Sequence, residues 1–267
     1  MERLKKFDEF LNEGGGLLPF LGAVLTGNVD LGLADKDSEE GEVASADGTY
    51  EPSTNYVAIP GNDDFTLYMQ HQQGVAGAKG IVQAMLGTGE MAKDTIATKN
   101  GVKYANLVMN IPSNKPQVKK DVIAALDKGD QKTAAALFLN TWKEKWNSIQ
   151  ATAKTDINDP KNATVKDAIT KACNKYKVPF DFAITVAQIE SRLNPKAGNA
   201  TYKGLFAMKP SSNYGGVVTP MGNKWSDPYV NAENGVKLLK DNIKQFKKTL
   251  GNDWASLKVG SWANNLV

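Results

Sequence analysis

A single glutamate carries the strongest chemical signal in the sequence. In the stretch FAITVAQIESRLNP, Val186 and Ile189 recur at helical spacing, and Glu190 stands beside this apolar stripe just before an Asn-Pro pair ends the helix. Burial beside apolar groups favours the neutral form of a carboxyl group. Glu190 is therefore suited to protonate a leaving oxygen, as the cleavage of a glycosidic bond requires. The alternative is a surface glutamate paired with Arg192 or a lysine.

The other reactive side chains predict no second catalytic centre. Cys173 is the only cysteine and follows Ile169 at helical spacing, so we expect a buried structural thiol and no disulfide within the chain. His71 is the only histidine. One histidine and one cysteine do not make a metal site or a nucleophilic triad, and we expect neither a metal nor another cofactor.

Composition and charge narrow the possible partners. The chain has 267 residues, of which 41% are hydrophobic, so it can bury a real core. Its 32 basic and 29 acidic residues leave a net charge of +3, without a basic run that would predict nucleic-acid binding. The segment MERLKKFDEFLNEGGG is too charged for a signal peptide, and GLLPFLGAVLTG is too short to span a bilayer. We expect no stable membrane insertion.

The elements that must position Glu190 are mostly helices. Residues 1–61 read as a leader and an extended arm, because the acidic, turn-rich stretch from Ala34 to Tyr56 has no helical period. Strand signals are weak, apart from a small hairpin expected around residues 202–208. The fold class is therefore mainly α. The apolar periodicity predicts helices within residues 115–129, 130–146, 159–179, 180–193 and 225–251.

Two segments resemble the lytic transglycosylase and goose-type lysozyme superfamily. ESRLNPKAGNATYKGLFAMKP is similar to its Glu-Ser helix end followed by a Gly-Leu-Phe turn, and WSDPYVNAENGVKLLKDNI to the long helix after the cleft. The resemblance covers residues 164–250 and implies a lysozyme-like fold that acts on bacterial peptidoglycan. It implies that Glu190 protonates the oxygen between N-acetylmuramic acid and N-acetylglucosamine. The same residue then takes the C6 hydroxyl proton, which closes a 1,6-anhydro ring.

The resemblance also implies further site residues. Ser191 matches a serine that orients the substrate or the acid, and Ala207 stands where the family commonly has a glutamine, so an amide that could hold a sugar is missing. A second carboxylate has no place defined by a motif, although Asp227 or Glu233 could lie near the cleft and serve a hydrolase. The substrate-binding candidates that the resemblance implies on this side of the chain are Ser191, Gly204, Leu205, Phe206 and Asn231.

An upstream segment completes the expected cleft. LYMQHQQGVAGA resembles a Tyr-x-x-His-Gln segment that follows the catalytic glutamate in many phage transglycosylase domains, whereas here it precedes Glu190. This order suggests a circularly permuted domain, in which Tyr68 and Gln72 share a helix face directed at Glu190. Within a domain of residues 62–267, residues 62–91 and 160–267 would form the cleft. Residues 92–159 would be a helical insertion of unknown role. The alternative is an unrelated helical module.

The N-terminus suggests a setting for this chemistry. LKKFDEFLNEGGG resembles the leader of capsid-packaged proteins in large tailed phages, with a cleavage point after Glu13; an amphipathic helix that docks on a partner subunit fits equally well. We therefore expect a peptidoglycan lytic transglycosylase in a phage virion, in the tail, baseplate or interior, which acts in the host periplasm and cell wall. Its arm would contact other virion proteins. The alternative is a catalytically silent, lysozyme-like structural virion protein that binds wall or neighbouring subunits.

Overall fold

The computed structural model describes residues 64–91, 111, 115–257 and 259–266, without the side chains of residues 71–76. The expected leader and arm, residues 1–61, lie outside the described residues. Residues 92–110 and 112–114 of the expected insertion lie outside them as well. The helices are α3 (Asp64–Leu86), α6 (Pro116–Asp127), α7 (Gln131–Asp156), α8 (Ala163–Tyr176), α9 (Phe180–Ser191), α10 (Pro228–Leu250) and α11 (Ser261–Asn264). Short 3₁₀ turns connect them, at residues 160–162, 214–216, 222–226 and 251–256. The predicted mainly α class is confirmed.

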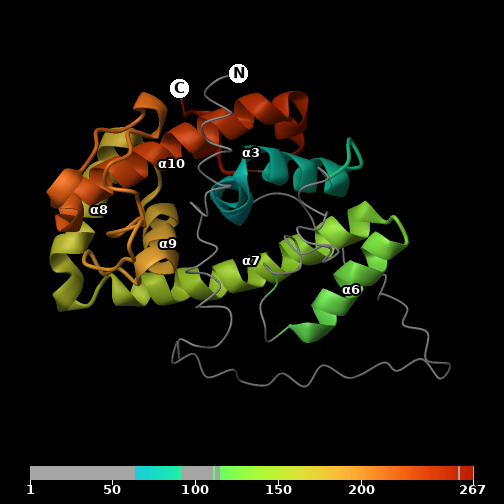
Figure 1. The fold of residues 1–267 in the computed structure, drawn as a ribbon, viewed down its shortest axis with the longest axis horizontal. Coiled ribbons are helices and arrows are strands. Elements are labelled where there is room, and N and C mark those ends of the chain that lie inside the picture. The colour runs from blue at the N-terminus through green and yellow to red at the C-terminus, as the bar shows by residue number, and fades with distance from the viewer. Residues whose placement is uncertain (1–63, 92–110, 112–114, 258, 267) are drawn as a thin grey trace.

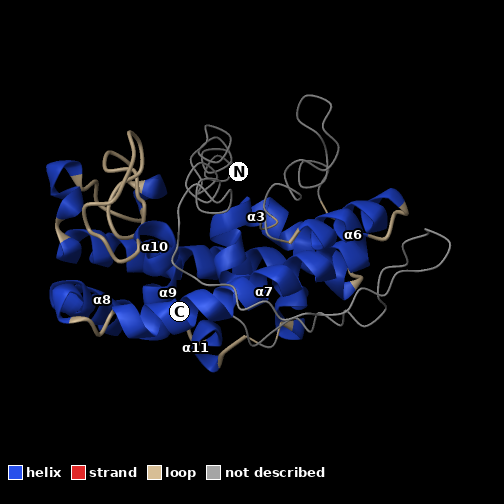
Figure 2. Cartoon of the chain, turned by 90° about the horizontal axis from the view of Figure 1, so that it is seen from below, coloured by secondary structure: helices blue, strands red, loops and turns tan. Residues whose placement is uncertain are grey.

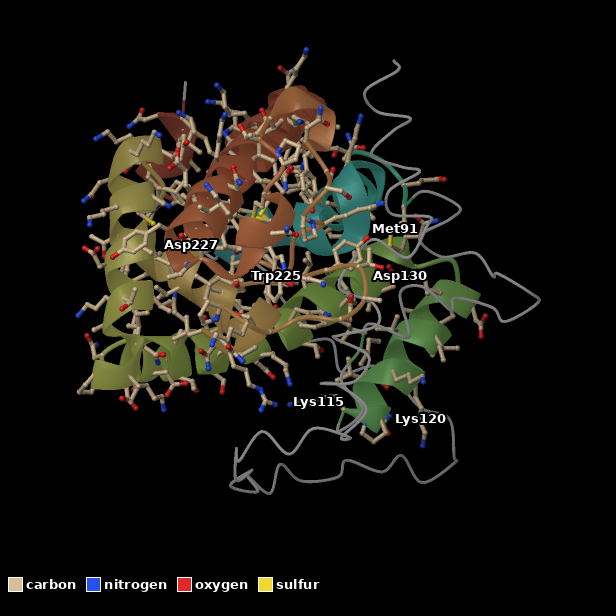
Figure 3. The ribbon with its side chains drawn as sticks, turned by 60° about the vertical axis from the view of Figure 1, so that its left-hand side comes forward. Met91, Lys115, Lys120, Asp130, Trp225 and Asp227 are labelled. Atoms are coloured by element: carbon tan, nitrogen blue, oxygen red, sulfur yellow. The ribbon has the colours of Figure 1, made fainter. Side chains whose placement is uncertain are left out.

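Capping residues set the starts of the two long helices α7 and α10. Asp130 is the N-cap of α7, and its carboxylate accepts a hydrogen bond of 3.0 Å from the Thr133 amide. Asp227 caps α10 in the same way, accepting from the Tyr229 amide at 2.8 Å, and Pro228 occupies the first position of that helix. Figure 3 shows Asp227 next to Trp225 at this helix start. Both long helices therefore begin where their caps place them.

Two long helices organise the packing. α7 runs along one side of the molecule and contacts α3, α6 and α9, while α10 packs on α8 and α3. Figure 2, seen from below, shows α9 beside α7. The helix that ends in Glu190 is α9, and it is therefore held between α7 and α8.

An aromatic cluster joins α3, α7 and α9. The ring of Phe65 stacks on Trp142 with centroids 5.6 Å apart, and Tyr68 lies 5.3 Å from Trp146. Trp146 in turn lies 5.8 Å from Phe182 on α9. These rings are almost fully buried, so they fix the relative positions of three helices. α7 belongs to the segment expected to be an insertion without a role, and in the structure it supports the helices that carry Tyr68 and Glu190.

The expected β-element is small. Lys203 forms isolated bridges with Gly198 on one side and with Met208 on the other, and the described part of the chain contains no longer strand. Gly204 and Ala207 have positive φ values of 81° and 43°, which turn the chain within four residues. Such a tight turn leaves too little extended backbone for a ladder.

Candidate active site

Glu190 lies at the buried end of α9. Arg192 and Leu193 follow it with φ values of 55° and 60°, and this left-handed pair ends the helix. The Glu190 side chain is only 2% exposed. The predicted position beside the apolar stripe is therefore confirmed, and a surface glutamate paired with Arg192 is excluded, because Arg192 is exposed whereas Glu190 is buried.

Tyr68 reaches Glu190 from α3. Its hydroxyl donates a buried hydrogen bond of 3.0 Å to Oε1 of Glu190, across 122 positions of the sequence. Burial raises the pKa of Tyr68 well above its ordinary value, and the charge of Glu190 and their hydrogen bond add to this effect. Tyr68 is therefore a neutral donor over the whole physiological pH range. The proximity of these two residues, expected from the upstream segment, is present in the structure.

Ser191 does not contribute its hydroxyl proton to the site. The side chain is 3% exposed, and its hydroxyl donates a 2.9 Å bond to the carbonyl of Ala187, one turn back on the same helix. Such back-bonding is common for serine in helices. The role expected for Ser191, orienting the substrate or the acid, stays a prediction.

Asn231 stabilises the Gly-Leu-Phe turn through hydrogen bonds. Its Oδ1 accepts from the Phe206 amide at 3.0 Å, and its Nδ2 donates to the carbonyls of Trp225 at 3.1 Å and Lys203 at 3.3 Å. A Cβ on Gly204, whose φ is 81°, would lie 2.0 Å from Nδ2 of Asn231. Only glycine therefore fits at this turn beside the amide.

Asn231, Leu205 and Phe206, which are expected to bind substrate, are buried in this conformation, and their substrate contact stays a prediction. Asn231 and Leu205 are 0% exposed and Phe206 is 3% exposed. Phe206 packs on Gly235 of α10 so closely that a Cβ there would lie 2.3 Å from the ring. These side chains stabilise the turn. The polar atoms of Asn231 hydrogen-bond to backbone groups, and Leu205 and Phe206 pack in the core. Gly204 is buried as well.

The other candidates are placed as follows. The side chain of Gln72 lies outside the described residues, as does that of His71. Ala207, where an amide was expected to be missing, is half-buried with a φ of 43°. Cys173 is a buried free thiol, as predicted, and burial raises its pKa to about 12. Glu233 pairs with Lys175, which lowers the pKa of this carboxyl.

The two carboxylates considered for a hydrolase both have structural partners at the start of α10. Asp227 caps the helix, and Glu233 accepts bonds from Lys175 and from the Tyr176 hydroxyl, the latter at 3.1 Å. Asp227 and Glu233 therefore stabilise the start of α10, whereas Glu190 is the buried carboxyl group that Tyr68 contacts.

Tyr214 is a partly buried tyrosine that the sequence did not indicate. Its hydroxyl accepts a 2.6 Å hydrogen bond from the Lys209 amide. Burial raises its pKa, and the charges of Tyr202 and Glu190 raise it further. No motif or periodicity marks this tyrosine, because it lies in an irregular loop after the Gly-Leu-Phe turn.

Within the described residues, no histidine, cysteine or carboxylate cluster could hold a metal ion. None of the helices in the same part of the chain combines the length and the apolar character that crossing a membrane requires.

One part of the chain matches a known protein family. Residues 167–260 match the family model described as the transglycosylase SLT domain. No curated protein and no solved structure matched the chain. Residues 167–260 therefore form a lytic transglycosylase-like domain, which contains Glu190, Asn231 and the turn between them. The matched family comprises peptidoglycan lytic transglycosylases, which are lysozyme-like glycosidases, so the match indicates this kind of enzyme for residues 167–260. Tyr68 lies outside the matched stretch.

Proposed function

We propose that the chain cleaves the β-1,4 bond between N-acetylmuramic acid and N-acetylglucosamine, with Glu190 as its single catalytic residue. The observation that carries the proposal is the 3.0 Å hydrogen bond from Tyr68 to Glu190, which fixes one buried carboxyl group inside the transglycosylase-like domain. Residues 64–91 complete the site although they precede the domain in the sequence, which supports the permuted arrangement.

The proposed reaction uses Glu190 twice. As an acid it protonates the glycosidic oxygen, so that the bond to C1 of N-acetylmuramic acid breaks and N-acetylglucosamine leaves with its new hydroxyl. As a carboxylate it then removes the proton of the C6 hydroxyl, whose oxygen bonds to C1 and closes the 1,6-anhydro ring. The proton returns to Glu190, so the cycle balances without water. A side chain that is 2% exposed favours this internal attack, because little water has access to it.

Tyr68 has a positioning role in this scheme. The phenol donates to Oε1 of Glu190, so it holds the carboxyl group in one rotamer and stabilises its anionic form after the first proton transfer. Its raised pKa keeps the hydroxyl protonated throughout the cycle.

The proposed setting is a tailed phage particle that delivers the enzyme to the host cell wall, where it acts in the periplasm. The resemblance of residues 4–16 to the leader of packaged virion proteins supports this setting, with cleavage after Glu13 and the arm as a contact to other virion proteins. Mass spectrometry of the protein recovered from particles, with a new N-terminus at Gly14, tests it. An intact N-terminus in assembled particles would contradict leader cleavage.

A second candidate function is a silent, lysozyme-like structural protein that binds wall without cutting it, and Ala207 is the observation in its favour. The test is to incubate purified full-length protein with peptidoglycan and to identify the products by mass spectrometry. The products distinguish a transglycosylase, a hydrolase and a silent protein. Anhydro ends support the transglycosylase, reducing ends support a hydrolase, and intact glycan in the presence of measurable wall binding supports the silent protein.

A further inference from the structure

Helix α7 contacts both α3 and α9 (Figure 1), and it fixes the end of α9 that carries Glu190. The side-chain amide of Gln188, two positions before Glu190, donates a hydrogen bond of 2.8 Å to Oδ2 of Asp156 at the end of α7. Nearer the start of α9, the ring of Phe182 lies 5.8 Å from the ring of Trp146, which also belongs to α7. The position of Glu190 is therefore set relative to α7.

Tyr68, the hydrogen-bond donor to Glu190, packs against the same helix. Its ring lies 5.3 Å from the ring of Trp146, and the ring of Phe65, three positions earlier on α3, lies 6.2 Å from that of Trp146. These three aromatic side chains are almost fully buried. Such close packing leaves the phenol little freedom to turn or tilt. Trp146 therefore contacts both the helix of the donor and the helix of the acceptor.

The hydrogen bond between Tyr68 and Glu190 depends on this packing. Its two oxygen atoms are 3.0 Å apart, and hydrogen bonds weaken steeply as their geometry departs from the best distance and angle. A smaller side chain in place of Trp146 leaves a gap beside the Tyr68 ring, and the surrounding structure closes such a gap only in part. The ring can then move toward the gap and draw its hydroxyl away from Glu190. Such shifts matter for catalysis, because a misplacement of about 1 Å can cost about 10²-fold in rate.

We propose that Trp146 is a positioning residue for the reaction, which acts through Tyr68: its ring holds the phenol where the hydroxyl bonds Glu190. This inference rests on the proposed function, since it assigns a role within the same site. It also gives the expected insertion a function, because Trp146 lies within residues 92–159 and outside the stretch that matches the family model. Because its side chain is buried, Trp146 should affect kcat and leave KM nearly unchanged.

The test is a double-mutant cycle in the full chain, with soluble peptidoglycan strands as the substrate and the anhydro products measured by mass spectrometry. Trp146→Phe keeps an aromatic ring of smaller size, and we expect kcat to fall about 5- to 50-fold, as the weakening of one hydrogen bond to a charged group implies. In the Tyr68→Phe background the same substitution should change kcat by less than about 2-fold, because no phenolic hydroxyl is left to be positioned.

Trp142→Phe is the matched control. Trp142 lies one turn before Trp146 on α7, is as deeply buried, and stacks on Phe65 with ring centroids 5.6 Å apart. The same truncation there should lower the unfolding temperature to a similar extent but leave kcat within about 2-fold of the wild-type value. Trp146→Met, whose flexible side chain can fill part of the gap, repeats the measurement with a second variant at the same position.

Three outcomes would overturn the inference: wild-type kcat in both Trp146 variants, an equal loss of kcat in Trp142→Phe, or an undiminished loss in the Tyr68→Phe background. Each of the last two would show that Trp146 supports the fold and does not act through the phenol. Failure of the proposed function is recognised separately, because the wild-type chain itself would then release no anhydro products.

Discussion

The hydroxyl of Tyr68 lies 3.0 Å from Oε1 of Glu190, and both side chains are almost completely buried although 122 positions separate them in the sequence. α3 and α9 contribute one residue each, and α7 is the common support of both helices. The candidate site is therefore a property of helix packing across the whole described chain. The stretch matched by the family model contributes only one side of the pair.

Replacing Glu190 by glutamine should abolish most of the cleavage. Glutamine keeps the shape and an acceptor for Tyr68 but cannot transfer a proton, and general acid–base catalysis is worth about 10²- to 10⁴-fold in rate. Release of soluble muropeptides from peptidoglycan measures the effect, and thermal unfolding should be nearly unchanged. Glu233→Gln is the matched control, because this carboxylate is partnered by Lys175 away from the reaction. A Glu190→Gln variant that cleaves at the wild-type rate would refute the assignment.

Tyr68→Phe should lower both activity and stability. It removes a donor to a buried carboxylate, and leaving such a group with fewer partners costs about 1 to 3 kcal/mol in the free energy of unfolding. This stability cost is expected because the phenol is buried against Glu190. Tyr176→Phe serves as the control, since that hydroxyl binds Glu233 near the surface. Chemical denaturation gives the comparison, and equal costs for the two variants would contradict it.

Asn231→Ala should destabilise the Gly-Leu-Phe turn. The substitution removes one acceptor and one donor that together hold Phe206, Trp225 and Lys203, and each buried backbone group left without its partner costs about 1 to 3 kcal/mol. Asn234→Ala, which loses a single bond to the Thr219 carbonyl, is the matched control and should cost less. Urea denaturation of both variants measures the difference. If Asn231→Ala unfolds like the wild type and only weakens substrate binding, the positioning role is wrong.

Cys173 should make stability depend on pH at the alkaline end. Its thiol has a pKa of about 12 in the native state, against 9.0 for the ordinary value, so the unfolded chain loses the proton first as pH rises. The stabilising contribution is fully present below pH 9 and is lost between pH 9 and pH 12, by about 1.4 kcal/mol per pH unit. Comparing the unfolding free energy of wild type and Cys173→Ala at pH 8 and pH 10.5 isolates this group from other titrations. A gap that is the same at both pH values would contradict burial of the thiol.

The sequence by itself determined the helices and the acid. The caps Asp130 and Asp227 and the apolar face of α10 are local patterns, and local patterns depend only on neighbours a few positions away. For the same reason the apolar stripe was sufficient to place Glu190 on the buried side of α9. The small β-element was also predictable in position, although not in its reduction to isolated bridges.

Only the tertiary structure decided what surrounds Glu190. It assigned Asn231 and Phe206 to the support of the turn and made α7 the common base of α3 and α9. The direct bond from Tyr68 was expected in outline, but its geometry required the packing of the aromatic rings between the helices. The physical reason is that residue periodicity gives each helix a buried face, while the partner of that face and the register between them follow from the fit of side chains distant in the sequence.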